Sequence, residues 1–566
     1  MPSESPPEAL ARAAALLKAR RWDELEAACQ ELLAKNPEDF GALRLLAFGR
    51  LNAGRYARAL GAAARALKLR PRAWKLIGLR AGALAALGRN KEAVAAYDRA
   101  LALQPARMPL LFGRGKALRA LRRHREALET YDRALALKPD NPAALLNRGN
   151  ELRSLGRMGD AVQAFRRALE VKPEYADALN NLGNALQDQG HYEEALGHYR
   201  SALRIKPDYI AALNNQGNAL MALGRYRESI ALHDRVLALE PGRPAALWNK
   251  GTAMLSLGLS KEAWELYEHR LQTPMYAKLP KLGLPLLSGK PPRGAKVLVQ
   301  WEVRFGDIIQ MLRYVPALQQ TEAECWLQVA KPLRELAARS FPQARIVGLR
   351  QSGEATCRIP FTSLPLMMET FSEAAIPCAV PYLVPDPVKT GHWRQAVGQG
   401  GGPRIGLSWR GNPVPAQRSI ALESLLPLLR APQASFVTLQ KNLTAEERAL
   451  LQGMPNVSVV DEELASFDDT AAVLAGLDLV ITIDSAVAHL AGALGRPTWV
   501  LLKLGSDWRW MSDREDTPWY PTARLFRQAV LGEWDPVVRR VCKALDELSA
   551  GQPTQRRPSM RPRRAK

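Results

Sequence analysis

The first half of the chain repeats one pattern of apolar and small residues at a constant spacing. Prolines recur at positions 37, 71, 105, 139, 173, 207 and 241, each 34 residues after the one before. A 34-residue period is the length of a repeat built from two packed helices, so the pattern predicts an α-solenoid. Proline ends the second helix of each unit because it cannot donate to the preceding turn. About eight units run from residue 6 to residue 277.

Small residues recur at fixed places inside each unit, where two helices must approach closely. In the unit 176–209 these are Gly183, Ala195 and Ala202, and in the unit before it Gly149, Ala161 and Ala168. The larger Leu182, Tyr192 and Tyr199 fill the space between the helices. This set of residues resembles the tetratricopeptide repeat (TPR). The resemblance implies a TPR superhelix over residues 1–277, with a concave groove that binds protein.

Asparagines also follow the repeat. Asn147, Asn181, Asn215 and Asn249 share one position of the first helix in successive units. An amide both donates and accepts, so a row of amides can hold an extended peptide backbone whatever its sequence. The row resembles the asparagine ladder of the protein O-GlcNAc transferases, which implies a protein or peptide acceptor in the groove. The alternative is consensus residue choice, with the amides bonded locally or between repeats.

The second half changes to short apolar runs alternating with amphipathic segments, after a Pro/Gly-rich linker at 278–294. The runs are 296–301, 323–330, 344–349, 404–409, 435–441, 457–461, 477–483 and 498–502. Strands that alternate with helices indicate parallel, doubly wound sheets. We expect two Rossmann-type lobes, at 295–392 and 393–548, with a ligand cleft between them. A turn is expected at 303–307 and a helix from Ile308. Glycines 398, 400, 401 and 402 precede a strand and are read as a hinge.

The stretch ITIDSAVAHLAGALGRP, at 481–497, passes from a strand into a helix. Ligands of such sheets bind at the carboxyl edge of the strands, and a helix start favours anions. Ser485 adds a hydroxyl donor, and His489 lies on the same face four residues later. The junction therefore predicts a diphosphate site, with Asp484 capping or contacting sugar. The alternative is that Asp484 and Ser485 only cap the helix and His489 packs against the sheet.

Several motifs resemble the carboxyl-terminal domain of bacterial TPR proteins related to glycosyltransferase family 9, the heptosyltransferase-like GT-B enzymes. They are GDIIQMLRYVPAL, GLSWRGNP with RSIAL, VTLQK, the stretch at 477–502 and the tryptophan-rich segment after it. The resemblance implies that Asp307 is the general base. It also implies that Arg418 binds the donor phosphates, together with Ser485, Ala486 and His489. Gln440 and Lys441 are expected to contact the nucleotide.

Two motifs depart from the family. VRFGD stands where relatives have a glycine-rich GLGD turn, and Asp484-Ser485-Ala486 replaces Asp-Thr-Gly. The first change hinders close backbone approach, and the second keeps the hydroxyl. We expect the tryptophans at 508, 510 and 519, with Tyr520, to pack across a lobe; stacking on a base or sugar is the alternative. Asp468 and Asp469 are expected to cap a helix. No Asp-x-Asp metal signature occurs, so we expect no metal and no cofactor.

Composition adds limits on partners and location. The 566 residues carry a net charge of +23, and residues 41–120 hold 17 Lys and Arg against 2 Asp and Glu. Such a surface could meet nucleic acid, but Arg-rich composition alone explains it, and we do not expect a nucleic-acid partner. The five scattered cysteines, the absence of a signal peptide and the lack of an apolar spanning run predict a cytoplasmic protein. Residues 549–566 form a basic tail that we expect to be disordered.

These patterns predict a metal-independent glycosyltransferase. It would move a sugar from a nucleotide-sugar donor to a hydroxyl of an acceptor, for which a protein held by the TPR groove is the first candidate. The alternative is a non-catalytic TPR scaffold or adaptor with a degenerate transferase-like domain.

Overall fold

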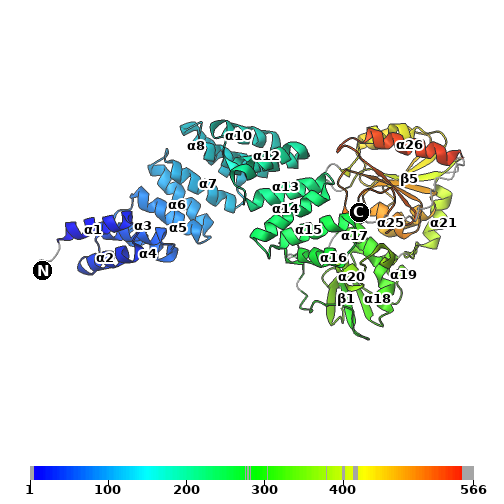
Figure 1. Cartoon of the computed structure of the whole chain (residues 1–566), viewed down its shortest axis with the longest axis horizontal. Coiled ribbons are helices and arrows are strands. Elements are labelled where there is room, and N and C mark those ends of the chain that lie inside the picture. The colour runs from blue at the N-terminus through cyan, green and yellow to red at the C-terminus, as the bar shows by residue number, and fades with distance from the viewer. Residues whose placement is uncertain are drawn as a thin grey trace. The chain divides into compact units, whose positions relative to one another are not determined.

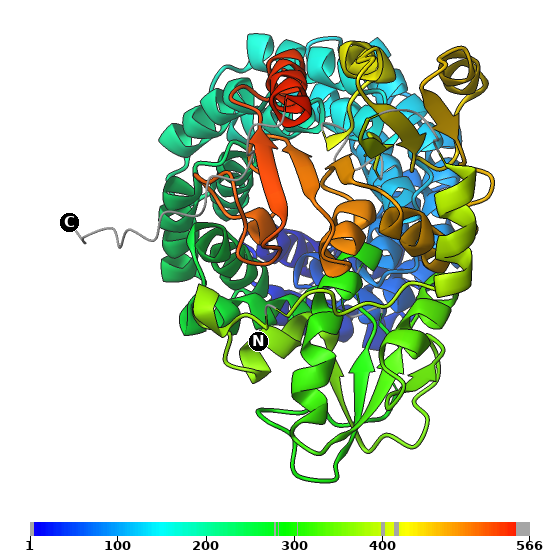
Figure 2. The ribbon, with the colours of Figure 1, turned by 90° about the vertical axis from the view of Figure 1, so that its right-hand side faces the viewer.

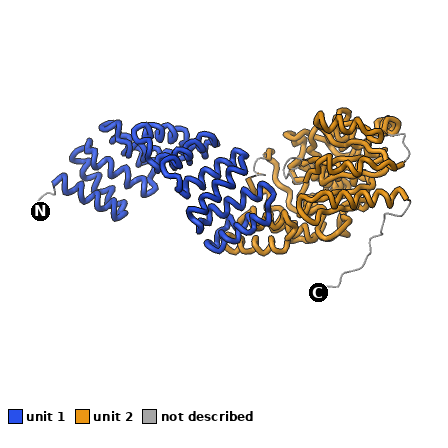
Figure 3. Tube along the Cα trace, turned by 90° about the horizontal axis from the view of Figure 1, so that it is seen from above, with its two compact units in different colours: residues 1–215 blue, residues 216–566 orange. Residues whose placement is uncertain are grey.

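The computed structural model describes residues 5–550 except 275, 277–278, 281, 303, 378, 398–401 and 412–417. Two compact units divide the chain, residues 1–215 and residues 216–566 (Figure 3). The last two repeats thus share a unit with the α/β half, whereas the sequence placed the boundary at residue 277. Three parts of the sequence lie outside the described residues: 551–566, 412–417, and glycines 398, 400 and 401 of the expected hinge.

Sixteen helices form eight antiparallel pairs, as the 34-residue period predicted (Figure 1). They are α1 Pro6–Lys18, α2 Trp22–Lys35, α3 Phe40–Asn52, α4 Tyr56–Leu69, α5 Trp74–Ala86, α6 Asn90–Leu103, α7 Met108–Ala120, α8 His124–Leu137, α9 Pro142–Ser154, α10 Met158–Val171, α11 Ala176–Asp188, α12 Tyr192–Ile205, α13 Ile210–Ala222, α14 Tyr226–Leu239, α15 Pro244–Leu257 and α16 Lys261–Glu268. A Cβ on Gly183 would meet the Tyr199 ring at 2.6 Å. The expected close packing within a repeat is therefore present.

The last two repeats pack on the α/β half through aromatic side chains. Trp264 of α16 lies edge-on to Trp508, with ring centroids 5.1 Å apart. Its Nε1 donates to Thr370 O at 2.8 Å. The hydroxyl of Tyr226 in α14 donates to Ser506 O at 3.0 Å. These contacts explain why the compact unit begins inside α13. They also show that Trp508 of the tryptophan-rich segment packs against a helix of the repeats.

The first lobe is a four-stranded parallel sheet of order β3-β2-β1-β4 (green in Figure 2). Its elements are β1 Lys296–Gln300, α17 Phe305–Met311, α18 Val315–Gln319, β2 Glu324–Gln328, α19 Arg334–Ser340, β3 Arg345–Val347, β4 Cys357–Pro360 and α20 Leu364–Met367. The strand β4 was not predicted. Part of the expected linker also joins this edge, since Leu287 N–H donates to Arg358 O at 2.8 Å.

The second lobe is a six-stranded parallel sheet of order β10-β9-β8-β5-β6-β7. Its elements are α21 Pro387–Ala396, β5 Arg404–Ser408, α22 Leu426–Leu429, β6 Ser435–Thr438, α23 Ala445–Gln452, β7 Val457–Val459, α24 Phe467–Ala475, β8 Leu479–Ile483, α25 Ala486–Ala493, β9 Thr498–Leu502, β10 Ala523–Arg527 and α26 Asp535–Ser549. The strand β10 was not predicted. The order reverses between β5 and β8, and ligands of open α/β sheets bind at such a switch point. A TPR solenoid followed by an α/β half is confirmed.

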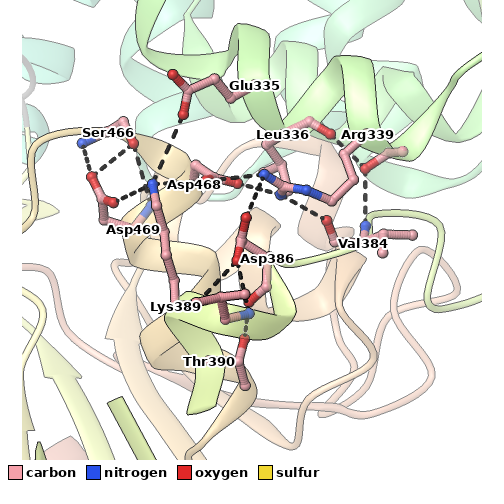
Figure 4. Close-up of polar contacts among 12 residues, drawn as sticks. Glu335, Leu336, Arg339, Val384, Asp386, Lys389, Thr390, Ser466, Asp468 and Asp469 are labelled. Atoms are coloured by element: carbon pink, nitrogen blue, oxygen red, sulfur yellow. Dashed lines mark hydrogen bonds and ion pairs between the residues drawn. The ribbon is translucent and has the colours of Figure 1, made fainter. Parts of the chain in front are cut away.

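An ion cluster joins the two lobes (Figure 4). Arg339 of α19 pairs with Asp468 of α24 at 2.5 Å and with Asp386 at 3.3 Å. Lys389 of α21 pairs with Asp468 at 2.9 Å and with Asp469 at 2.7 Å. The two cations lower the pKa of Asp468 although burial raises it. Asp469 also takes the N–H of Ser466 at the start of α24, as expected of a cap, whereas Asp468 is an interlobe ion-pair residue.

Candidate functional site

The helix α25 starts at the carboxyl end of β8 with donors left open. Ser485 occupies the N-cap position with extended backbone angles, yet its side chain accepts no hydrogen bond from the helix. Its hydroxyl instead pairs with Thr482 Oγ1 at 3.1 Å. The first helical donor is the N–H of Ala488, which bonds to Ser485 O at 3.1 Å. The N–H groups of residues 485–487 therefore have no acceptor within the helix. The expectation that Ser485 only caps the helix is wrong for its side chain.

Arg418 lies beside this helix start. Its Nη1 is 3.8 Å from Asp484 Oδ2, and the arginine side chain is 12% exposed. It ends the loop that leaves β5, while Asp484 leaves β8, so both groups flank the switch point of the sheet. Burial, followed by the charge of Asp507, raises the pKa of Asp484. Arg418, Asp484, Ser485 and Ala486 thus lie together as the sequence predicted.

Asp307 belongs to the opposite lobe and lies in a helix, not in a turn. The helix α17 begins at Phe305, so Gly306 and Asp307 form its first turn. The Asp307 carboxylate takes the N–H of Arg304 at 3.3 Å. A Cβ on Gly306 would meet His489 Cδ2 at 2.7 Å, so the missing side chain lets α17 pack against α25. Burial raises the pKa of Asp307, although Arg509 opposes this effect.

Three charged residues of the site were missed by sequence reasoning. Arg509 binds Asp307 Oδ1 at 2.9 Å and Asp507 Oδ1 at 2.6 Å, and its side chain is 5% exposed. Lys503 follows β9, and burial lowers its pKa to about 8 while Asp484 and Asp507 oppose the shift. All three lie in or next to the segment whose tryptophans were taken as packing residues. The arginine between two tryptophans, at position 509, was the one sequence feature that could have indicated a charged group in this segment.

His489 is almost completely buried beneath aromatic side chains. Its side chain is 4% exposed, and its Nδ1 lies 2.9 Å from the Tyr520 hydroxyl. Trp510 stacks on the imidazole with centroids 5.2 Å apart. Burial, helped by the charge of Arg509, lowers the pKa of His489 to about 3. The ring is therefore neutral at physiological pH.

Gln440 and Lys441 have different surroundings from those expected. The Gln440 carboxamide is buried and takes the backbone N–H of Arg410 at 2.8 Å and of Trp409 at 3.3 Å. Gln440 thereby ties the ends of β5 and β6 together. Its carboxamide oxygen bonds the backbone, and its contact with a nucleotide stays a prediction. Lys441 is exposed in the loop that follows.

Each ladder asparagine is engaged within the repeats. Asn147 donates to Ala143 O at 2.7 Å and accepts from Arg119, and Asn215 donates to Asn180 at 2.9 Å. Asn181 donates to Asn150 at 2.8 Å, and Asn249 donates to Asn218 at 2.9 Å. Asn150, Asn184 and Asn218 form a second row, also 34 residues apart. These bonds agree with the alternative of bonding between repeats, and peptide binding stays a prediction.

Two surface hollows among the described residues lie away from this junction. One is lined by 240–245 with 272–274, and the other by Phe40 with 70–73. Within the described ranges, no cluster of three or more His, Cys, Asp or Glu side chains is arranged to hold a metal. In the same ranges, every helix is too short or too polar to cross a membrane.

Comparison with known families agrees with both halves. The Tetratricopeptide repeat profile matches residues 49–107, 112–170, 146–210 and 214–270. The profile of Glycosyltransferase family 9 (heptosyltransferase) matches residues 443–505, which contain β8, α25 and β9. This second match covers the candidate diphosphate junction but not Arg418 or Asp307.

Individual relatives share only part of the chain. Protein FlbA of Caulobacter vibrioides is 29% identical over 317 residues, 51% of this chain and 52% of its own length. The chain thus matches about half the length of this curated relative. A tetratricopeptide repeat protein from Parabacteroides merdae is 14% identical, with a TM-score of 0.38, and the match covers 44% of this chain and 98% of that one. YrrB, a TPR protein with an unusual peptide-binding site, is 22% identical with a TM-score of 0.27, covering 33% and 95%. The chain therefore carries tetratricopeptide repeats followed by a region similar to glycosyltransferase family 9.

Proposed function

We propose that this protein is a metal-independent glycosyltransferase of the two-lobed GT-B type. It takes a nucleotide-diphosphate sugar at the junction of β5, β8 and α25 and transfers the sugar to an acceptor hydroxyl. The observation that carries the proposal is the pairing of Arg418 with an uncapped helix start at the switch point of the second sheet. The similarity of residues 443–505 to glycosyltransferase family 9 supports the same reaction class.

The donor side of the site is built for a leaving diphosphate. As the bond between the sugar carbon and the phosphate oxygen breaks, negative charge grows on that oxygen. Arg418 and the open N–H groups of 485–487 stabilise this charge without a metal ion. Ser485 is the N-cap residue of this helix, and its own N–H is the first of these donors. Lys503 follows the neighbouring strand β9, and its Nζ donates to Leu504 O at 3.1 Å and to Gly505 O at 2.7 Å.

Asp307 is the proposed base on the acceptor side. It takes the proton of the acceptor hydroxyl while that oxygen bonds to the sugar carbon. Its pKa is raised by burial, which brings it nearer to the pH at which a carboxylate base works well. Arg509 holds the carboxylate at 2.9 Å and keeps it oriented. A protein acceptor bound by the repeats and a cytoplasmic location complete the proposal.

A calorimetric screen of UDP-, GDP- and ADP-sugars tests the donor site. We expect one donor class to bind the wild type and to lose roughly tenfold or more in affinity in Arg418→Ala, as for a charged hydrogen bond. Arg430→Ala is the matched control, because Arg430 is an exposed arginine that ends α22 in the same lobe. Equal affinities in the wild type and Arg418→Ala would refute the donor site.

A second function is favoured by one observation, the ion pair that already engages Asp307. If Arg509 holds the carboxylate too firmly for proton transfer, the domain binds a nucleotide sugar without turnover and the repeats serve as an adaptor. Donor binding without transfer, unchanged in Asp307→Ala, would identify this adaptor.

A further inference from the structure

A phenol lies directly behind the imidazole of the candidate donor site. Tyr520, next to β10, places its hydroxyl oxygen 2.9 Å from Nδ1 of His489, and both side chains are buried. Trp510 stacks on the imidazole face. Packing and this hydrogen bond together fix the ring, so its two nitrogens face different groups. Which nitrogen carries the proton decides what the ring can do for a ligand.

The hydrogen-bond geometry favours Nδ1 of His489 as the acceptor of the Tyr520 proton. Burial keeps the pKa of Tyr520 well above 10, so the phenol is protonated. The guanidinium of Arg313 lies 4.8 Å from the Tyr520 ring centroid and offers only donors. The neighbouring Tyr382 hydroxyl donates its own proton to Ile309 O at 3.0 Å. A buried hydroxyl that has an acceptor at 2.9 Å uses it.

The other edge of the imidazole leads to the same assignment. Nε2 lies 4.0 Å from Asp484 Oδ1. An N–H facing this carboxylate attracts it, whereas a nitrogen lone pair would repel it. With a pKa of about 3, His489 holds a single ring proton at neutral pH. That proton therefore lies on Nε2.

We propose that Tyr520 is a positioning residue that holds His489 as the neutral Nε2–H tautomer, so that His489 serves the site as a fixed hydrogen-bond donor and never as a base. This inference rests on the proposed function for the identity of the ligand. The helix N–H groups, Arg418 and His489 Nε2 all donate. Such a set matches an unprotonated phosphate oxygen, which only accepts, better than it matches a sugar hydroxyl.

The tautomer can be read directly in the free protein. The full chain labelled with 15N-histidine is recorded by long-range 1H–15N correlation, and His489→Gln identifies the His489 signals. We expect an unprotonated Nδ1 and a protonated Nε2. In Tyr520→Phe, which keeps the ring packing, signals of the Nδ1–H tautomer should appear. Tyr382→Phe is the matched control, because it removes a neighbouring hydroxyl that bonds Ile309 instead, and it should leave the pattern unchanged.

Two results would overturn the assignment. One is a protonated Nδ1 in the wild type, and the other is an unaltered pattern in a folded Tyr520→Phe. The wild-type measurement depends only on the assignment by His489→Gln, so misfolding of Tyr520→Phe cannot hide the answer.

Ligand binding then separates this inference from the proposed function. UDP, GDP and ADP are titrated into the wild type, His489→Gln and His489→Asn. Glutamine places its amide N–H near the position of Nε2, whereas asparagine places it near Nδ1. We expect Gln to keep the affinity and Asn to lose about tenfold, the effect of one hydrogen bond to a charged group. Equal losses would refute the donor role of His489. A wild type that binds none of the three nucleotides, yet shows the Nε2–H tautomer, would refute the proposed function and leave the role of Tyr520 intact.

Discussion

The starts of α17 and α25 are two versions of the same junction, a central parallel strand that runs into a helix. At α17 the chain supplies its own anion, since Asp307 takes the N–H of Arg304 and binds Arg509. At α25 the N-cap serine turns its hydroxyl to Thr482 and leaves the helix donors open. A helix start favours negative charge in both places. The first junction is therefore filled from within, and the second is the one that the proposed function assigns to a ligand.

The comparison assigns different chemistry to the two lobes. A fixed carboxylate with a raised pKa suits proton transfer, and an open donor set suits an anionic leaving group. Gly306 lets the two junctions touch, because a side chain there would strike His489. Three kinds of variant test this division of roles. They place an anion at the start of α25, remove the carboxylate at the start of α17, or force the two helices apart.

The largest effect is expected from emptying the filled junction. Asp307→Asn keeps the shape of the side chain and removes the base, so kcat should fall by about 10³-fold. Affinity for the donor sugar should change little, because the donor binds at the other junction. Initial rates of sugar transfer and calorimetry with the donor measure the two quantities.

Asp535→Asn is the control, an exposed aspartate in the first turn of α26. Unchanged kcat in Asp307→Asn would show that the filled junction has no chemical role, and it would favour the adaptor.

Filling the open junction at the start of α25 should have opposite effects on stability and on donor binding. Aspartate is a strong N-cap residue, and Ser485 already has extended backbone angles. Ser485→Asp should raise the free energy of unfolding by about 1 kcal/mol and weaken donor binding by roughly tenfold to a hundredfold, since its carboxylate takes the place of the phosphate. Urea unfolding measures the change in the free energy of unfolding, and calorimetry measures the change in affinity for the donor sugar.

The matched variant is Ser260→Asp, at an N-cap whose serine already accepts the N–H of Ala263. It should change neither quantity by much. Tighter donor binding in Ser485→Asp would mean that the helix start does not meet an anion.

Separating the junctions should cost stability. The Cβ of Gly306→Ala would lie 2.7 Å from His489, so α17 and α25 must move apart, at a cost of about 2 kcal/mol. Gly391→Ala in α21 is the matched control, because nothing lies within 4 Å of its added Cβ. It should stabilise by about 0.5 kcal/mol, as alanine does in a helix. Equal unfolding free energies for the two variants would argue against close helix contact.

The sequence was sufficient for features that depend on local pattern. The 34-residue period, eight of the ten strands in the described part of the α/β half and the junction at Asp484 all follow from short-range rules of helix and strand formation. The edge strands β4 and β10 were missed because arginines interrupt their apolar runs, at Arg358 in β4 and Arg524 in β10. The start of α17 was misplaced because Gly306 reads as a turn residue, although here it serves helix packing.

Contacts between distant segments could not be predicted in the same way. The pair of Arg509 with Asp307 joins the segment after β9 to the helix after β1, and no spacing rule links them. Gln440 looked available at a strand end, but the backbone of Arg410 occupies it. The Tyr520 hydroxyl that orients His489 lay inside a segment read only for its aromatic packing. Partners of buried polar groups depend on the assembled fold, and sequence reasoning supplied the residue types without the pairs.

The smallest expected effect concerns how Arg509 tunes the filled junction. Arg509 favours the ionised form of Asp307 and so opposes the rise in its pKa that burial causes. Removing the guanidinium in Arg509→Gln should raise that pKa further, by about one unit. At a given acidic pH less Asp307 is then ionised, and the acid limb of the kcat/KM profile moves to higher pH. Arg509→Lys keeps the charge and should leave the limb near its wild-type position.

The same profile tells Asp307 apart from His489 as the base. His489 has a pKa of about 3, lowered by burial and by Arg509. Loss of Arg509 should therefore raise the pKa of His489 as well, but from a value well below the working pH. An acid limb that moves in Arg509→Gln but not in His489→Gln identifies the carboxylate. An acid limb that moves in His489→Gln and stays fixed in Arg509→Gln would exchange the roles of the two junctions, since the open one would then hold the base.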